Sequence, residues 1–459
     1  MKNVNKKEMK TNRTISEYKS KLILLFAVLM ASSTLMAQNG ENTIIKRAQK
    51  LSSSPKTSIS LYDITAEILS SNNNEVRIEL DYIAKGKDEE VAKLKTKLEN
   101  DLLQVSSSGE VKIDLTFQNN FDLEIMGMKW SKLTFKSDKK ETIKLKEFKV
   151  QSFKVWLPAK QNMTLSAKYS RVKLQTNIEG SLNLDAYDTE LTAKSITGDI
   201  NGQAKYSNLT FANTGEIKLS LYETKLHAEN TSNGQFEAKY SGIVIKSMQD
   251  LKLDIYEGSL LVPTIANANI KSKYAELSLG SLQELKLEAY EGRCKLGDAN
   301  KLTINAKYVE ISGDKVETLQ MLEGYENTIT FDAIGSLNSK DGKYNNFSIG
   351  ELHHSLSLSG YEDEIDIESI SKEFKNIAIS GKYIDANIFI KSPHAYRLQG
   401  IVQYPDLSID ESAYKIKKKI GDENKMEFEY DYKEVNDASP KIELHGYEMD
   451  IRIHHLSFE

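Results

Sequence analysis

Short runs of alternating apolar and polar residues fill the chain from residue 151 to about residue 410. In one run Leu251, Leu253 and Ile255 fall on one face, and after Tyr256 the apolar phase slips to Leu260. Alternation with a period of two indicates a β-strand, and a one-residue slip indicates a bulge or a corner. Each tyrosine of this kind therefore marks a corner between two short strands.

These tyrosines form two interleaved series. The first ends strand patterns such as Leu-Lys-Leu-Asp-Ile-Tyr, recurs about every 35 residues, and comprises Tyr187, Tyr222, Tyr256, Tyr290, Tyr325 and Tyr361. The second follows a lysine, as in Ala-Lys-Tyr-Ser, and comprises Tyr169, Tyr206, Tyr240, Tyr274, Tyr308, Tyr344 and Tyr383. Together they place a tyrosine about every 17 residues from Tyr169 to Tyr361, which indicates an internal repeat.

Two short strands and two turns that recur without helices predict an all-β fold, a parallel β-solenoid. The favoured rung holds about 17 residues, so that two rungs make one repeat of about 34 residues. The alternative is a single rung of about 34 residues, with the two tyrosine series at opposite corners. The two models differ at Tyr240, which contacts Tyr222 and Tyr256 only if the rungs are short.

The flanking regions resemble caps, which a solenoid needs at its open ends. Residues 38–150 are expected to form a small α+β N-terminal cap, with strands at 58–69, 76–83, 111–117 and 143–157. A helix is predicted at 88–104, where Asp88 is the capping residue. Its apolar stripe consists of Val91, Leu94, Leu98 and Leu102. The repeats occupy 151–410. Residues 411–459 lose the repeat and form the expected C-terminal cap, with a lysine-rich start and a strand-like ending from Ile442 to Phe458.

The first 37 residues have the pattern of a secretory signal peptide. Seven basic residues precede the apolar run from Leu22 to Met30, and the small residue Ala37 precedes the expected cleavage point. The run is shorter than the ~20 residues that a membrane-spanning helix needs, although an anchored N-terminus is the alternative. Removal of the leader changes the net charge from −5 to −10. The mature chain is therefore expected in a periplasm, at the cell surface or outside the cell, without a transmembrane segment.

Composition excludes several classes of function. The chain has 61 basic and 66 acidic residues and no basic domain, which argues against nucleic acid as a partner. The single cysteine, Cys294, excludes an intramolecular disulfide and a cysteine-rich metal cluster. It stands in the apolar phase, at a position that holds leucine in other repeats, so we expect it to be buried and inert.

Two stretches of the chain resemble a known family. Phe153-Lys-Val-Trp156-Leu-Pro158 and the following segment from Met163 to Leu174 are similar to the start of the family called putative adhesin domain. The resemblance covers roughly residues 58–400. It implies short β-solenoid rungs, as in that family of unknown function, and it supplies no catalytic or ligand-binding residues. The chain departs from the family at its corners, where tyrosine replaces glycine and serine.

The candidate site is the first tyrosine series: Tyr187, Tyr222, Tyr256, Tyr290, Tyr325 and Tyr361. Stacked along a rod, these rings form a ladder that either covers the corner or faces a ligand, since sugar rings pack on aromatic side chains. An acidic residue follows each ring, either solvating the turn or holding calcium through oxygen ligands. The adjacent histidines at 353–354 and 454–455 point to opposite faces of a strand, so neither pair chelates a metal. No catalytic residue, metal or cofactor is expected.

These observations favour an exported, non-enzymatic envelope or surface protein that presents a repeated face for adhesion or assembly. A glycan or an envelope protein is the expected kind of partner. The competing interpretation is a carbohydrate-active β-helix enzyme or a glycan-binding module, because β-helices also host such activities. An enzyme needs unrepeated polar residues, and the irregular zone from Tyr383 to Tyr414, with His394, Arg397 and Asp406, is the best place for them.

Overall fold

The computed structural model describes residues 42–51, 56–121, 131–135, 142–391 and 394–456, which form 28 β-strands, one α-helix and one short 3-10 helix. The predicted signal peptide and its apolar run lie outside the described residues. The chain divides by its contacts into two units. The smaller unit takes its described residues from the ranges 1–46, 79–100 and 117–152, and the larger unit contains 47–78, 101–116 and 153–459.

The smaller unit contains the helix. Helix α2 (Asp88–Asp101) has an acidic first turn and buries Leu94 and Leu98, so the predicted helix is confirmed, with an end three residues earlier. The Glu90 carboxylate accepts a hydrogen bond of 2.9 Å from the backbone N–H of Lys144, which ties the first turn to strand β9 (Thr142–Leu157). This bond lowers the pKa of Glu90. Strands β7 (Phe117–Phe121) and β8 (Ser131–Phe135) pair antiparallel with each other, and β8 pairs antiparallel with β9.

Strands β1 (Asn42–Lys50) and β4 (Glu75–Gly86) each run from one unit into the other, as β9 does. The larger unit begins with β2 (Lys56–Tyr62), β3 (Thr65–Ser70), β5 (Leu103–Val105) and β6 (Val111–Leu115). It continues through β10 (Asn162–Lys168), β11 (Arg171–Ile178), β12 (Leu182–Tyr187), β13 (Glu190–Ile196), β14 (Ile200–Lys205), β15 (Asn208–Thr214), β16 (Ile217–Tyr222) and β17 (Lys225–Thr231). The long strands β18 (Asn233–Lys295), β19 (Ala299–Tyr325), β20 (Thr328–Lys343) and β21 (Asn346–Tyr361) bend at corners, and β22 (Glu364–Ile367), β23 (Asn376–Lys382) and β24 (Asp385–Lys391) follow them.

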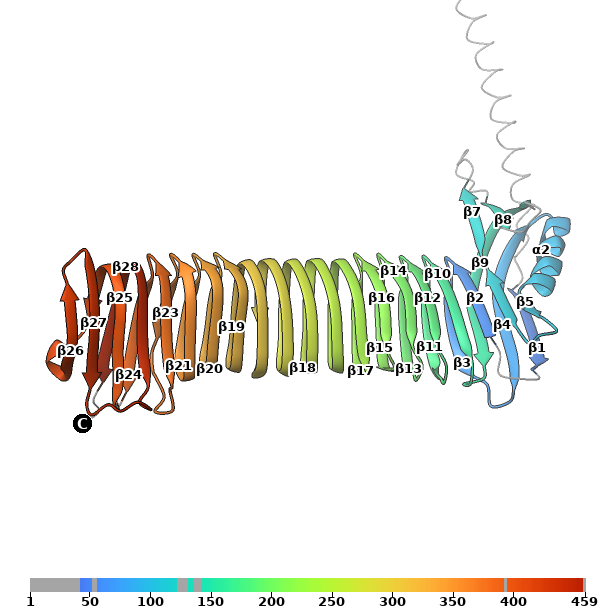
Figure 1. Cartoon of the computed structure of the whole chain (residues 1–459). Helices are drawn as coiled ribbons and strands as arrows, with labels where there is room; N and C mark the ends of the chain where they lie inside the picture. Colours follow the sequence, from blue (N-terminus) through green and yellow to red (C-terminus); the bar gives the residue numbers. More distant parts are fainter. Residues whose placement is uncertain (1–41, 52–55, 122–130, 136–141, 392–393, 457–459) are drawn as a thin grey trace, which may run out of the picture. The chain divides into compact units, whose positions relative to one another are not determined.

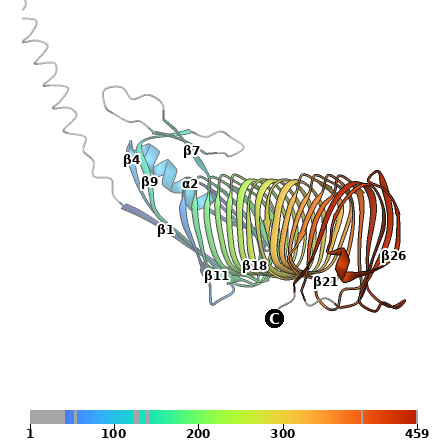
Figure 2. The same cartoon turned by 90° about the vertical axis from the view of Figure 1, so that its left-hand side faces the viewer.

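From β10 to β24 the strands of the larger unit pair in parallel, at offsets of 17 to 21 residues along the chain. Leu165 pairs with Leu184, Leu184 with Gly202, and Ala204 with Leu221. These offsets agree with the short period predicted from the tyrosines, which the register therefore confirms. We call two consecutive strands and the corner between them a rung. Rungs follow one another along the long direction of this unit, as Figures 1 and 2 show from two sides.

Apolar side chains from successive rungs fill the interior of the stack. Leu253 and Leu219 are 1 % and 3 % exposed, whereas Lys252 is exposed on the outer surface. The predicted strand faces are therefore confirmed. Because side chains alternate across a strand, each rung contributes a short apolar row to one continuous core.

The parallel stack begins earlier in the sequence than residue 151. The run predicted as one strand at 58–69 is two strands, β2 and β3, which pair in parallel with β10 and β11. A corner at Asp63, with φ of 56°, separates them. The segment between β3 and β9 interrupts the sequence between this rung and the next, which hides it from a search for regular spacing.

The C-terminal end of the stack has a different pairing. Strand β25 (Tyr396–Ser408) pairs antiparallel with β27 (Lys425–Tyr432), which pairs antiparallel with β26 (Tyr414–Gly421). The short helix η1 (Glu411–Ala413) precedes β26. Strand β28 (Lys441–Leu456), predicted from the sequence, returns to pair in parallel with β23, β24 and β25. The lysine-rich stretch predicted to open this region lies on β26.

Candidate functional site

Each tyrosine lies in a two-residue corner, and the corners are of two kinds. In a Lys-Tyr corner the tyrosine has a positive φ, as in Tyr240 at 54°. In a Tyr-Glu corner the acidic residue after the tyrosine has the positive φ, as Glu257 does at 45°. The left-handed region turns the chain sharply and costs a residue with a side chain about 1–2 kcal/mol. This regular positive φ on tyrosine was not visible in the sequence.

The two kinds of corner alternate along the stack. The register pairs Lys168 with Tyr187, Tyr187 with Lys205, Lys205 with Tyr222, and Tyr222 with Lys239. The same alternation is seen again from Tyr290 to Lys307 and from Tyr325 to Lys382. We call this line the Lys/Tyr row: Lys168, Tyr187, Lys205, Tyr222, Lys239, Tyr256, Lys273, Tyr290, Lys307, Tyr325, Lys343, Tyr361 and Lys382. All six tyrosines predicted as the candidate site stand in it.

The rings of both tyrosine series interleave in one ladder. Tyr240 lies 5.7 Å from Tyr222 and 5.7 Å from Tyr256 between ring centroids, so it contacts both of them, as the shorter of the two predicted spacings requires. Successive rings are 5.4 to 5.8 Å apart and nearly perpendicular, at 72° to 83°. The ladder runs from Tyr62 through Tyr361 and Tyr383 to Tyr447 and Tyr404. Each edge-to-face pair contributes about 0.5–1.5 kcal/mol beyond its buried area.

The two series differ in exposure. Rings with positive φ, such as Tyr240, are 40 % to 48 % exposed, while the rings of the Lys/Tyr row are half-buried between them. Burial, followed by the carboxylate of Glu223, raises the pKa of Tyr222. At Tyr256 the charge of Glu257 is the larger cause of the raised pKa. The hydroxyl groups of Tyr222 and Tyr256 therefore stay protonated at neutral pH.

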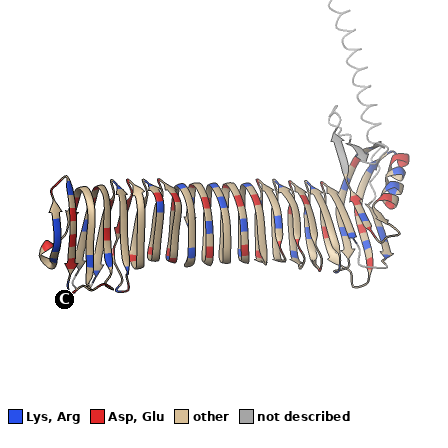
Figure 3. Ribbon diagram, viewed as in Figure 1, with Lys and Arg blue, Asp and Glu red and all other residues tan. Residues whose placement is uncertain are grey.

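A shallow groove runs beside the ladder, on the strands that precede the corners. One part of it has a volume of about 760 Å³ and is lined by Tyr240, Tyr256 and Tyr290 with charged residues between them. Lys271 and Glu288 form an ion pair of 2.8 Å there. A second part of about 480 Å³ shares lining residues with the first and extends it as far as Gln203. Charged residues recur on rung after rung (Figure 3).

A buried polar column lies under the corners, one residue after the position with positive φ. The Ser207 hydroxyl accepts a hydrogen bond of 3.1 Å from the N–H of Thr189 and donates one of 2.7 Å to the Lys205 carbonyl. Thr224 accepts from the N–H of Ser207 at 3.3 Å, and Ser241 accepts from that of Thr224 at 3.1 Å. These hydroxyls satisfy backbone groups that the sharp turn removes from the sheet. The serine of the Ala-Lys-Tyr-Ser motif was the sequence signal for this column.

The column changes chemistry further along the stack. Asn345 Oδ1 accepts from Asn327, and Asp363 Oδ1 accepts from the Asn345 backbone N–H at 2.8 Å and from its side chain at 2.9 Å. The other oxygen of Asp363 has no hydrogen-bond partner among the described residues. Burial raises the pKa of Asp363 to about 6. A Cβ at Gly360 would lie 1.8 Å from this oxygen, so a larger residue there would have to displace the Asp363 side chain.

The structure also places the other candidate residues. The acidic residues of the Tyr-Glu corners stand on every second rung, so two rungs, about 9.6 Å, separate neighbours in the series. No group of three or more potential metal ligands occurs among the described residues. Cys294 is 1 % exposed, which confirms its predicted burial, and this burial raises the pKa of its thiol to about 12.

The adjacent histidines take separate environments at the C-terminal end. The ring of His454 stacks on Phe389 at 4.7 Å, whereas His455 Nε2 lies 2.7 Å from the Tyr396 hydroxyl and 3.3 Å from that of Tyr414. Desolvation lowers the pKa of His455. Adjacent residues on this strand thus reach different partners, as strand geometry predicts. Sequence reasoning missed the Tyr396–Tyr414–His455 cluster, since its members are up to 59 residues apart.

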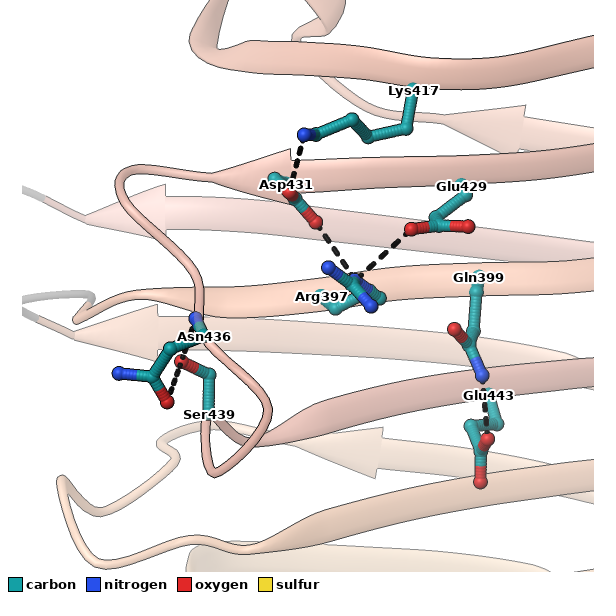
Figure 4. Close-up of polar contacts among 8 residues, drawn as sticks. All are labelled: Arg397, Gln399, Lys417, Glu429, Asp431, Asn436, Ser439 and Glu443. Atoms are coloured by element: carbon teal, nitrogen blue, oxygen red, sulfur yellow. Dashed lines mark hydrogen bonds and ion pairs between the residues drawn. The ribbon is translucent and has the colours of Figure 1, made fainter.

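The irregular zone contains a network of charged residues (Figure 4). Arg397 Nε lies 2.9 Å from Asp431 Oδ1 and 3.3 Å from Glu429 Oε1, and Lys417 Nζ lies 3.8 Å from the other Asp431 oxygen. The Asp431 side chain is only 5 % exposed. Next to this network, Gln399 donates a 2.7 Å hydrogen bond to Glu443. The residues of this network occur once, unlike those of the ladder.

Three residues were singled out in this zone from the sequence. Arg397 stands before the corner at Tyr404 and Asp406 after it, so they lie on different faces of the rung. The ring of His394 packs against Phe374 at 5.1 Å. The structure does not bring Arg397 and Asp406 into one site.

Comparison with known proteins does not assign this chain to a family. No protein-family model matches this chain, and none of the curated proteins is significantly similar to it. One solved structure that resembles it is described as a putative cell adhesion protein from Clostridium sporogenes. The two are 9 % identical, the alignment covers 91 % of this chain and 100 % of the other, and the TM-score is 0.15, which carries no conclusion on fold or function. In the described part of the chain no helix has the length and apolar character needed to cross a membrane.

Proposed function

We propose that this chain is an exported, non-enzymatic β-solenoid that presents a repeated face for adhesion or assembly. The signal-peptide pattern at residues 1–37 supports export. The parallel register, which advances by one short repeat per rung and has a corner on each rung, supports the solenoid. The strands and helix before residue 151, apart from β2 and β3, which already pair in the stack, are proposed as its N-terminal cap, and the antiparallel strands β26 and β27 as its C-terminal cap.

The observation that carries the proposal is the groove beside the tyrosine ladder. It repeats the same kinds of side chain on successive rungs over a volume of about 760 Å³, and it continues into a second part of about 480 Å³. A repeated groove suits an extended partner that makes the same contact many times. It does not suit a reaction, because catalysis needs one distinct set of groups.

A groove-blocking experiment tests this proposal. Cys294 is buried, so a single introduced cysteine provides one accessible thiol. Asp254→Cys places it in the groove, where Asp254 is exposed and lines both parts. Lys194→Cys places it on an exposed position of β13, after the ladder, as the matched control. Both variants of the mature chain are coupled to a maleimide polyethylene glycol.

Binding to whole cells, purified envelopes and a glycan array is then measured. We expect the label at position 254 to abolish binding and the label at 194 to leave it intact. Equal binding by the two labelled proteins, or no binding by the unlabelled protein to any of these surfaces, would contradict the proposal. A turnover assay on each bound glycan tests the competing enzyme, which is favoured by the unrepeated Arg397–Asp431 network.

A further inference from the structure

Within the part of the chain that the structure describes, the lysines of the Lys/Tyr row have no partner of opposite charge. Seven lysines stand at this position: Lys168, Lys205, Lys239, Lys273, Lys307, Lys343 and Lys382. All seven are exposed, and none forms an ion pair within the described part of the chain. Other lysines on the same strands do have partners, such as Lys271 with Glu288 at 2.8 Å and Lys218 with Glu216 at 2.9 Å. Among the described residues, the row is therefore a line of free cations.

Their spacing is set by the alternation of the corners. One lysine occurs on every second rung, so neighbouring lysines are about 9.6 Å apart, twice the spacing of adjacent strands. A half-buried tyrosine ring stands between each two of them, as Tyr256 does between Lys239 and Lys273. The row thus repeats one positive charge and one ring over each pair of rungs.

The groove beside the row is also positively charged. Between residues 201 and 307, the exposed outward positions of the strands before the corners carry lysine at 205, 218, 239, 252, 271, 273, 286 and 307. Acidic residues occupy four of these positions, Glu237, Asp250, Asp254 and Glu288. The whole chain, in contrast, has a net charge of −5. The carboxylates of the Tyr-Glu corners, such as Glu257, come one residue after the tyrosine, and the charge of Glu257 lies close enough to the Tyr256 ring to raise the pKa of its hydroxyl.

We propose that the Lys/Tyr row and the groove beside it bind a linear acidic polysaccharide that carries one anionic group for every two sugar rings and lies along the stack. An extended disaccharide unit has about the length of two rungs, so each anion meets one lysine. The sugar between two anions lies against a tyrosine, whose edge and hydroxyl offer apolar contact and a hydrogen bond. This inference rests on the proposed function and names its ligand.

The same spacing disfavours other polyanions. A DNA strand carries a phosphate every ~3.4 Å, so a lysine every ~9.6 Å would neutralise about one phosphate in three. An extended acidic peptide presents a side chain to one face every ~6.6 Å, which also falls out of step with the row. An acidic polysaccharide with a charged group in every disaccharide stays in step over many rungs, so its contacts add along the chain.

The test uses the mature full-length chain and measures its affinity for hyaluronate, which has one carboxylate for every two rings. Dextran, single-stranded DNA and polyglutamate are measured beside it. The row variant combines Lys239→Gln, Lys273→Gln and Lys307→Gln. The control variant combines Lys173→Gln, Lys225→Gln and Lys295→Gln, which are exposed lysines on strands that follow the ladder.

We expect hyaluronate to bind and dextran not to bind. The row variant should lose about tenfold or more in affinity, with a shallower dependence on salt, because it has lost three charge contacts. The control variant should stay within about twofold of the parent in affinity, since its lysines lie outside the row.

Equal losses in the two variants, binding of DNA or polyglutamate as tight as that of hyaluronate, or no binding of hyaluronate would overturn the inference. If hyaluronate does not bind but cells or neutral glycans bind at the groove, the proposed function stands and only the inferred ligand is wrong. If neither hyaluronate nor any of these surfaces binds, the proposed function and the inferred ligand are both wrong.

Discussion

The middle of the stack and its C-terminal end are both built from β-strands but are held together in different ways. In the middle, the ring contact of Tyr222 with Tyr240 recurs with Tyr240 and Tyr256 at the same distance of 5.7 Å. At the end, contacts such as Tyr396 with His455 and Arg397 with Asp431 occur once and join residues 59 and 34 positions apart. Repetition therefore spreads stabilising contacts over many equivalent places, whereas the end depends on a few pairs.

The largest expected effect is a cavity in the repeated core. Leu253→Ala should reduce the free energy of unfolding by ~2–5 kcal/mol, because Leu253 is 1 % exposed and the neighbouring rungs collapse only in part. Lys252→Ala, on the outer face of the same strand, should change it by less than ~0.5 kcal/mol. Denaturant melts of both variants check this, and comparable losses would mean that the two faces are wrongly assigned.

At the C-terminal end the corresponding weak point is an ion pair. In the Arg397→Ala variant the nearly buried Asp431 keeps one basic partner, Lys417, at 3.8 Å. We therefore expect the free energy of unfolding to fall by ~2–4 kcal/mol. The double variant Arg397→Met, Asp431→Leu should regain most of it, because no uncompensated buried charge remains. Chemical denaturation of the three proteins provides the measurement. A double variant as unstable as the single one would show that the pair is not held by charge compensation.

The buried polar column offers a pH-dependent comparison. Asp363 has a pKa raised to about 6 by burial, against 3.8 for an ordinary aspartate. Between these pH values the folded chain holds a proton on Asp363 that the unfolded chain has lost. The stability of the folded chain therefore falls as the pH rises from 3.8 to about 6, and below pH 3.8 this group causes no loss of stability. A pKa shift of about two units corresponds to a loss of about 3 kcal/mol in the free energy of unfolding.

Asp363→Asn should remove this pH dependence and increase stability at pH 7 by ~1–3 kcal/mol, since the amide carries no charge. Asp366→Asn, on the neighbouring strand β22, is the control. Melts between pH 4 and pH 7 provide the test. If the parent and the Asp363→Asn variant show the same pH profile, Asp363 is ionised in the folded chain and the polar column is not buried at this position.

The smallest effect concerns the one thiol. Burial raises the pKa of Cys294 to about 12, so the native chain should react with maleimide far more slowly than the chain unfolded in denaturant. Labelling followed by intact mass measures both rates. Rapid labelling of the native chain would show that the rungs around Cys294 open readily.

The same contrast explains how far the sequence predicts this molecule. Regular tyrosines and the alternation around Leu253 were enough to predict the short rungs, the strand faces and the burial of Cys294, because each rung repeats the constraints of its neighbour. The corner at Tyr62-Asp63 was missed, since the smaller unit interrupts the sequence spacing. The positive φ of Tyr240 was missed because tyrosine rarely adopts it.

The candidate site was predicted only in outline. The six tyrosines were identified, but the lysines between them were not, because their alignment depends on a register in which Lys239 pairs with Tyr222 rather than with another lysine. The Arg397–Asp431 pair and the Tyr396–His455 contact depend on the antiparallel return of β27 and on β28, which no spacing in the sequence reveals.

The ladder, the Lys/Tyr row and the spacing of the proposed ligand all depend on the interleaving of the two kinds of corner. Disulfide formation measures it most directly, since a disulfide needs Cα atoms within about 7 Å. Tyr222→Cys with Lys239→Cys joins register partners on adjacent strands, ~4.8 Å apart, while Tyr222→Cys with Tyr256→Cys spans two rungs, ~9.6 Å. The account predicts a disulfide in the first pair and none in the second. A disulfide between positions 222 and 256, with none between 222 and 239, would contradict it.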